Sequence, residues 1–322
     1  MNINDNSLRL EVSTPELDAA ELEWWQKFSD IEERFCWVQT PDIQKFLRGH
    51  YLRQIIKLVP VNGTIVELGC GTGWLSILLA KLGAKRVIGI DFSSSQIEKA
   101  IQSAKMAGVA DKVSFEIGNI IDIFDFNNKS IRYDVVIIHG FLHHLATSEI
   151  RKVLDISRLI VSSDGILIVW EPVKYDGEIS EEDQKVLENF EALIQWLNTI
   201  PFLGKLRRIY SSKERHIRNL ISQRDVGTPP RGVSPKEMPF SPKELPFLLS
   251  EHFQIQQRKK CLVFSHIVAQ ELLLMKLSHR FIPYILKWPI LFKARQIEKK
   301  LLNSSGVLPN LWIFEMFMCR PK

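Results

Sequence analysis

Two acidic residues and three glycines are the part of this sequence best suited to bind a charged small molecule. Glu67 stands two residues before Gly69, Gly71 and Gly73 follow at alternate positions, and Asp91 lies further along the chain. Glycine lets a chain turn tightly and lets a ligand approach the backbone. A carboxylate beside such a turn disfavours phosphate and favours a cation, and Asp91 is placed to accept hydrogen bonds from a ribose. A nucleoside that carries a positive charge fits both acids.

These residues belong to a stretch with the pattern of a strand, a turn, a helix and a second strand. Apolar runs at 64–68 and 86–90 flank a segment of helical leucine spacing that ends at Gly83. This is half of a doubly wound α/β sheet, whose ligands bind at the carboxyl ends of the strands. A dinucleotide fingerprint needs glycine at position 74, where Trp74 stands. The pattern therefore favours S-adenosylmethionine (SAM) over a nicotinamide cofactor.

Residues 65–73, IVELGCGTG, resemble the first motif of the class I SAM-dependent methyltransferases. The resemblance is to the small-molecule type, which includes the quinone and natural-product group. It implies a Rossmann-like seven-stranded sheet, SAM as cofactor and S-adenosylhomocysteine (SAH) as product. It also implies that Glu67 faces the amino-acid part of SAM, that the backbone of Gly69, Cys70, Gly71 and Gly73 lies against the methionine portion, and that Asp91 holds the ribose.

The same resemblance assigns the adenine end of the cofactor site. Phe92 would pack on a face of adenine, and Asn119 and Ile120 would border it. The family commonly has Gly-Asp where this sequence has Gly118-Asn119; the asparagine keeps an acceptor oxygen and adds donors. His139, at the end of the next apolar run, would also lie near the cofactor.

Two histidines are candidates for moving a proton. Residues 139–145, HGFLHHL, resemble the L-H-H-L stretch of small-molecule methyltransferases, which places His143 or His144 near the methyl acceptor. An imidazole there could act as a base near neutral pH, or it could hydrogen-bond the loop backbone. Two adjacent histidines without further ligands predict no metal site. The acceptor is expected to contact three aromatic residues, Phe141, Trp25 and Trp37.

The amino-acid composition indicates the cellular compartment in which the protein is expected. The chain has 322 residues, of which 45% are hydrophobic and 25% charged, as in a globular protein with a sizeable core. It has no run of 18 apolar residues, and its polar N-terminus carries no secretory signal pattern. Four separated cysteines without C-x-x-C spacing argue for a reducing compartment and against a zinc site. We therefore expect a cytoplasmic protein.

Four regions are predicted along the chain. They are an N-terminal helical cap at 1–60, a SAM-binding core at 61–172, a helical and basic insert with a helix at 173–252, and the last two strands at 253–322 with a helical lid insert at 270–308. Within them, we expect helices at 14–35 and 42–58, a Ser95–Glu98 capping box, a turn at 163–165, and strands at 113–117, 134–138, 166–170, 253–267 and 311–319.

The expected reaction is methyl transfer from SAM to an oxygen, nitrogen or carbon nucleophile of a small or lipid-like metabolite, as in biosynthesis. The net charge of +5 is concentrated at 205–236, so an RNA methyltransferase stays an alternative, as does a SAM-binding module without activity. The region at 270–308 is rich in leucine and aromatics, which suits a lid over an apolar acceptor, a peripheral membrane contact or an oligomer contact. The absence of a [DN]-P-P-[YF] turn argues against DNA. The oligomeric state is left open.

Overall fold

The computed structural model describes residues 9–35, 55–60, 62–123, 132–175, 234–262 and 313–322, with a few isolated positions between them. Most of the helix predicted at 42–58, of the basic stretch and of the lid at 270–308 lies outside these ranges, as does Trp37.

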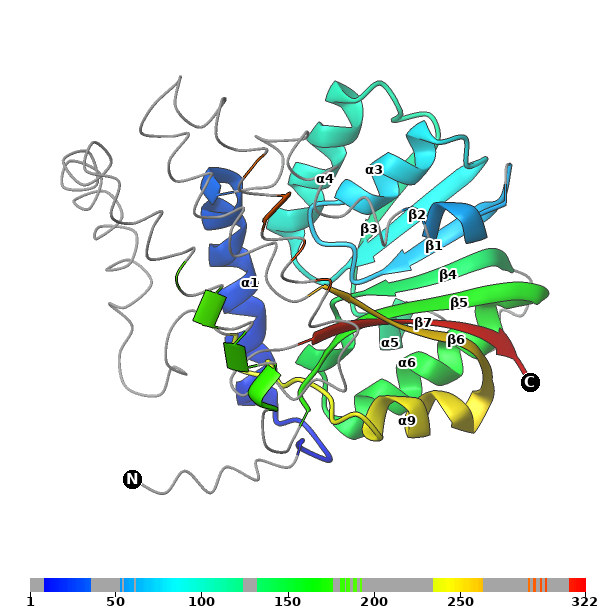
Figure 1. Ribbon diagram of the computed structural model, residues 1–322. Coiled ribbons are helices and arrows are strands. Elements are labelled where there is room, and N and C mark those ends of the chain that lie inside the picture. The colour runs from blue at the N-terminus through cyan, green and yellow to red at the C-terminus, as the bar shows by residue number, and fades with distance from the viewer. Residues whose placement is uncertain are drawn as a thin grey trace.

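Seven strands form one sheet in the order β3-β2-β1-β4-β5-β7-β6 (Figure 1). The strands are β1 (Thr64–Leu68), β2 (Arg86–Asp91), β3 (Val113–Ile117), β4 (Tyr133–His139), β5 (Val161–Val173), β6 (Phe253–Leu262) and β7 (Ile313–Pro321). The first five pair in parallel, and β7 runs antiparallel between β5 and β6. The predicted doubly wound, seven-stranded sheet is confirmed.

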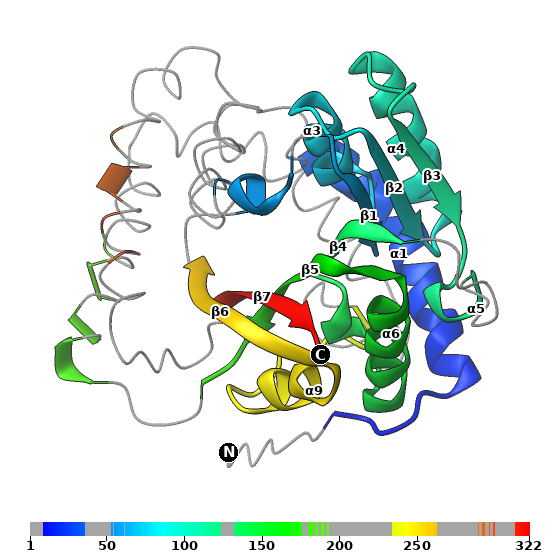
Figure 2. The ribbon, with the colours of Figure 1, turned by 90° about the vertical axis from the view of Figure 1, so that its right-hand side faces the viewer.

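Helices cover both faces of the sheet, which explains why its central strands are apolar without interruption. Successive residues of β1 enter opposite cores: Val66 and Leu68 pack with helices α6 (Thr147–Ile160) and α9 (Glu244–His252), and Ile65 packs with α3 (Trp74–Lys81). Figure 2 shows these helices on the two sides of the sheet. The remaining helices are α1 (Pro15–Phe35), α4 (Ser94–Met106), α5 (Ile120–Ile123) and the short 3-10 turn η2 (Leu142–His144).

The turn predicted at 163–165 is wrong, because β5 continues through it. Tyr133 of β4 pairs with Val161, and the next paired residues are Val135 and Ile166, so β5 carries extra residues at this point. Ser163 and Asp164 are exposed where the ladder is interrupted. A strand that bulges in this way keeps its direction while a few residues leave the ladder. The turn-forming sequence therefore marks a bulge.

The predicted capping box at Ser95 and Glu98 is also wrong. Helix α4 begins at Ser94 with Ser93 at the N-cap position, and no side chain caps it. The Ser95 hydroxyl donates instead to the carbonyl of Gln26 in α1, at 3.3 Å. A tertiary contact with the covering helix has taken the place of the local one.

The burial of Phe317 in β7 predicts how its loss would affect stability. The Phe317 side chain is fully buried, whereas Phe247 of α9 is 62% exposed. We expect Phe317→Ala to lower the free energy of unfolding by about 3–5 kcal/mol through lost burial and the cavity left behind. Phe247→Ala should change it by less than about 0.5 kcal/mol. Urea denaturation of both variants measures the difference, and equal midpoints would contradict the placement of β7 in the core.

Candidate active site

The turn between β1 and α3 is built around its glycines. Gly69, Gly71 and Gly73 have φ values of 72°, 52° and 71°, in the left-handed region that favours glycine. A Cβ atom on Gly69 would lie 2.5 Å from Cγ of Phe141, and one on Gly73 would lie 2.5 Å from the ring of Phe115. The backbone must therefore be bare at these positions, as a loop that cradles a ligand requires.

The two acids that frame this turn brace it with hydrogen bonds. Asp91 accepts from the amide of Gly71 and from the amide of Ser93, both at 2.9 Å. Glu67 accepts from the amide and the hydroxyl of Ser76, at 3.0 and 2.5 Å. Burial raises the pKa of Asp91, an effect that the two amides oppose.

One cavity of about 540 Å³ lies at the carboxyl ends of the strands, which is in the usual range for pockets that enclose a small molecule. It brings together nine residues predicted for cofactor binding, namely Glu67, Gly69, Cys70, Gly71, Asp91, Phe92, Asn119, Ile120 and His139. Gly73 does not line the cavity; it begins helix α3 just behind the loop.

Helix α1 covers this cavity. Asp18, Glu21, Leu22 and Trp25 line it, and Trp25 is one of the three aromatic residues predicted to contact the acceptor. The helix begins as predicted, with the Thr14 hydroxyl accepting from the amide of Leu17 at 3.3 Å. Phe141 and His144, from the loop after β4, line the same cavity. Predicted cofactor and acceptor residues thus line the same cavity.

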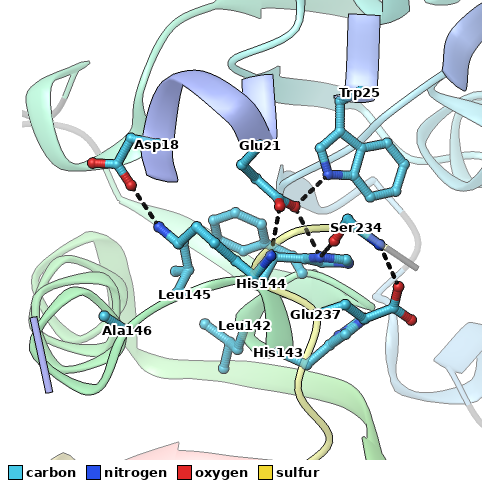
Figure 3. A network of polar contacts seen from close by, with 12 residues as sticks. Asp18, Glu21, Trp25, Leu142, His143, His144, Leu145, Ala146, Ser234 and Glu237 are labelled. Atoms are coloured by element: carbon cyan, nitrogen blue, oxygen red, sulfur yellow. Dashed lines mark hydrogen bonds and ion pairs between the residues drawn. The ribbon is translucent and has the colours of Figure 1, made fainter. Parts of the chain in front are cut away.

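His144 is the centre of a polar network that links three distant segments (Figure 3). Its Nδ1 atom lies 3.1 Å from Oε1 of Glu21 in α1 and 2.8 Å from the Ser234 hydroxyl. The indole N–H of Trp25 donates to Glu21 Oε1 at 2.8 Å, and the amide of Lys236 donates to Glu21 Oε2 at 2.9 Å. The carboxylate is therefore fixed in orientation by donors on both oxygens.

Lys236, the last residue of the basic stretch at 205–236, contacts two elements beside the cavity. Its ammonium group donates to Asp18 of α1 at 2.7 Å and to Glu149 of α6 at 2.9 Å, and its side chain is only 6% exposed. Glu149 in turn accepts from the amide of Ala146 at 2.8 Å. Residues 234–240, which we call the strap, thus hold α1 over the site.

Burial sets the charge state of the central pair. It lowers the pKa of His144, as does the neighbouring His143, and these effects outweigh the opposing influence of Glu21. Burial alone would raise the pKa of Glu21, but its bonds to His144, Lys236 and Trp25 lower it overall. Near neutral pH the imidazole is therefore neutral and the carboxylate charged, an arrangement that keeps the imidazole proton on Nδ1.

His143 points to a different partner. Its Nδ1 atom lies 2.6 Å from Oε2 of Glu171, and the other oxygen of Glu171 accepts from the amides of Phe141 and Leu142 at 2.9 and 2.8 Å. His143 does not line the cavity. Of the two roles considered for the histidine pair, loop support fits His143, and contact with the cavity belongs to His144.

Sequence reasoning missed the carboxylates that orient both histidines, and the strap. Glu21 carried one usable signal, since it stands four residues before Trp25 and so shares a helix face with it. Glu171 stands at the end of an apolar strand, where polar residues gather in this fold. Ser234 and Lys236 lie inside the insert predicted at 173–252, and no local pattern indicated that they contact the cavity.

The described part of the chain contains neither a cluster of metal-binding side chains nor a membrane-spanning helix. No group of three or more His, Cys, Asp or Glu side chains there could hold a metal ion. No helix in the same ranges has the length and apolar character needed to span a bilayer.

Residues 61–218 match the methyltransferase domain family. This segment therefore carries a methyltransferase domain of the class I, SAM-dependent type. A ribosomal protein L11 methyltransferase from Alkaliphilus metalliredigens is 30% identical over 124 residues, which are 38% of each chain. A ribosomal protein arginine N-methyltransferase from Schizosaccharomyces pombe is 47% identical over 60 residues, 19% of this chain and 11% of the relative. The chain therefore spans well under half the length of the curated relatives that it matches.

Among solved structures, a geranyl diphosphate C-methyltransferase from Streptomyces coelicolor A3(2) is 10% identical and has a TM-score of 0.47, covering 85% of this chain and 77% of that one.

The cofactor of this methyltransferase class, SAM, fits the described residues. A Cβ on Gly71 would lie 3.0 Å from Oε1 of Gln96, so only a bare backbone leaves the loop open to a ligand. Glu67 and Asp91 bring negative charge to the same space, which complements a sulfonium and an ammonium group. Carboxylate acceptors beside an open backbone loop are the set expected for a cationic nucleoside.

Glu171 generates a prediction about the histidine loop. Its carboxylate is fully buried and accepts from two loop amides and His143, so Glu171→Ala leaves these donors unpaired. We expect the free energy of unfolding to fall by about 2–4 kcal/mol. Asp164→Ala, an exposed position of the same strand, serves as the control. Chemical denaturation compares the two, and matching losses would show that Glu171 does not support the loop.

Proposed function

We propose that this protein transfers the methyl group of SAM to an oxygen, nitrogen or carbon nucleophile of a small or lipid-like metabolite. The observation that carries the proposal is a cavity among the described residues that joins the glycine loop and Asp91 to His144 beneath α1. The cofactor and the reacting atom of an acceptor would therefore meet inside an enclosed space.

The cofactor would be held along the carboxyl ends of β1, β2 and β3. The backbone of Gly69 and Gly71 would lie against the methionine portion, with Glu67 facing its ammonium group. Asp91 would accept from the ribose, and Asn119 would border adenine. Asn119 Oδ1 accepts from the amide of Ile121 at 3.0 Å, so the side-chain N–H groups of Asn119 would face the base.

The chemistry that SAM supplies when bound is a methyl carbon on a positively charged sulfur, already activated for in-line attack. The protein's own residues have to align the acceptor and exclude water, and orientation of this kind can lower a barrier by roughly 7–11 kcal/mol. The rings of Trp25 and Phe141 would contact the acceptor. His144, neutral and at the cavity wall, would take up its proton.

The cover over the cavity supports a small acceptor. Helix α1 and the strap are joined by the Lys236 contacts to Asp18, Glu149 and Glu21, so a large substrate would have to displace both. We place the reaction in the cytoplasm, in keeping with three buried cysteines that form no disulfide, Cys70, Cys261 and Cys319.

Cofactor binding is tested by the thermal shift with excess SAH. At about 100 times the dissociation constant, the ligand should stabilise the folded state by about 2.7 kcal/mol, or a few degrees. Asp91→Ala should weaken binding at least ~10-fold, since a buried hydrogen-bonding carboxylate is lost, whereas Asp111→Ala at an exposed turn should leave it unchanged. Equal affinities of the two variants would show that Asp91 does not hold the ribose.

The acceptor class is tested with methyl-labelled SAM and a fractionated cell extract. We expect label to appear in the low-mass fraction and to be absent when the protein is heat-inactivated. Label confined to protein or RNA would overturn the small-molecule proposal in favour of a macromolecular acceptor.

A further inference from the structure

We infer that Glu21, on the covering helix, positions His144 as the general base of the methyl transfer, so the acceptor is a nucleophile that loses a proton as it reacts. This inference rests on the proposed function. It gives helix α1 a part in the chemistry as well as in enclosing the cavity.

The contact between the two side chains has the geometry of an orienting pair. Glu21 Oε1 lies 3.1 Å from His144 Nδ1, and the two side chains are 4% and 9% exposed. The indole of Trp25 donates to this carboxylate and stands edge-on to the His144 ring, with centroids 5.1 Å apart. Ring and carboxylate are therefore held together by the same aromatic side chain.

Two residues of the strap complete the arrangement. The Lys236 amide occupies the second oxygen of Glu21, and the Ser234 hydroxyl lies against the same ring nitrogen of His144 (Figure 3). With acceptors on the Nδ1 side, the neutral imidazole carries its proton there and has its lone pair on Nε2. Nε2 is the atom that can receive a proton from an acceptor.

Four titratable groups influence His144 from the elements around it. Glu21 of α1 and Glu237 of the strap favour the protonated ring, and His143 of the same loop disfavours it. Asp91, at the end of β2, also senses the charge on His144. Burial and His143 together outweigh the two glutamates and lower the pKa of His144, while Glu21 stabilises the imidazolium that forms when a proton arrives.

The proposed reaction moves one proton to His144 and one methyl group to the acceptor. The acceptor X–H gives its proton to Nε2 of His144, and the freed electron pair on X forms the bond to the methyl carbon. The electron pair of the carbon–sulfur bond remains on sulfur, which becomes the neutral thioether of SAH. The positive charge passes from sulfur to the imidazolium, beside the Glu21 carboxylate, and leaves as a proton to solvent in the next cycle.

This assigns a chemical class to the acceptor. A hydroxyl group, an ammonium group or an acidic C–H group needs a base as it is methylated. A tertiary amine or a thioether needs none. The pair of Glu21 and His144 is thus suited to the first class.

The tautomer of His144 in the wild-type, full-length protein tests the inference. Long-range ¹H–¹⁵N NMR spectra distinguish a ring protonated at Nδ1 from one protonated at Nε2, and a His144→Gln sample assigns the signal. We expect the Nδ1–H form at pH 7.5 and an apparent pKa below the ordinary value of about 6.5. An Nε2–H tautomer would overturn the inference, because no lone pair would then be available at Nε2.

Glu21→Gln tests the positioning role, with Glu16→Gln as the matched control on an exposed face of the same helix. Loss of the carboxylate should lower the His144 pKa further, so the acid limb of the rate–pH profile should move to lower pH. The plateau kcat should fall at least ~10-fold, with an unchanged KM for SAM. Glu16→Gln should match the wild type in all three.

The outcomes separate this inference from the proposed function. A wild type that binds SAH and shows the Nδ1–H tautomer but labels no small molecule would contradict the proposed acceptor and leave the pair intact. A Glu21→Gln variant with unchanged kcat, pH profile and His144 pKa would overturn the inference while the methyl transfer stands. If the variant does not fold, the tautomer of the wild type decides.

Discussion

The burial of both faces of the central sheet is the constraint on which the rest of this structure depends. Strands β1 to β5 are flanked by two cores, so their faces have no room for a ligand or for uncompensated charge. Polar side chains therefore gather where the strands end. Glu67, Asp91, His139 and Glu171 all stand at or near carboxyl ends of neighbouring strands. The cavity and its chemistry follow from this edge.

Sequence patterns predicted the sheet well because its strands depend on local composition. The apolar run at 64–68 and the strand predicted at 113–117 agree with β1 and β3, and the glycine spacing at 69–73 predicted a tight turn, which tolerates no Cβ at Gly69 or Gly73. Errors arose where a tertiary contact replaced a local one. The Ser95 hydroxyl bonds Gln26 instead of capping its helix, and the turn-like residues 163–165 lie in a bulge of β5.

Only part of the site was predicted from the sequence, because the other residues come from segments that lie far apart in the chain. Residues fixed by the glycine loop and strand ends were found from motifs, but the partners of His143 and His144 come from α1, from β5 and from a strap that follows a long insert. Adjacent histidines in a tight turn point to different partners, and no sequence period reveals which one faces the cavity. Only the folded arrangement separates the supporting histidine from the one that lines the site.

The central claim is that the glycine loop, the ends of β2 and β3 and helix α1 enclose one SAM site. Hydrogen–deuterium exchange with and without SAH tests it most directly. The account predicts slower exchange at residues 69–73, 91–93 and 118–121 together with 18–25 of α1, and unchanged exchange in β6. Protection of the strand ends without α1 would contradict the enclosed site, and no protection at 69–73 would contradict the cofactor assignment itself.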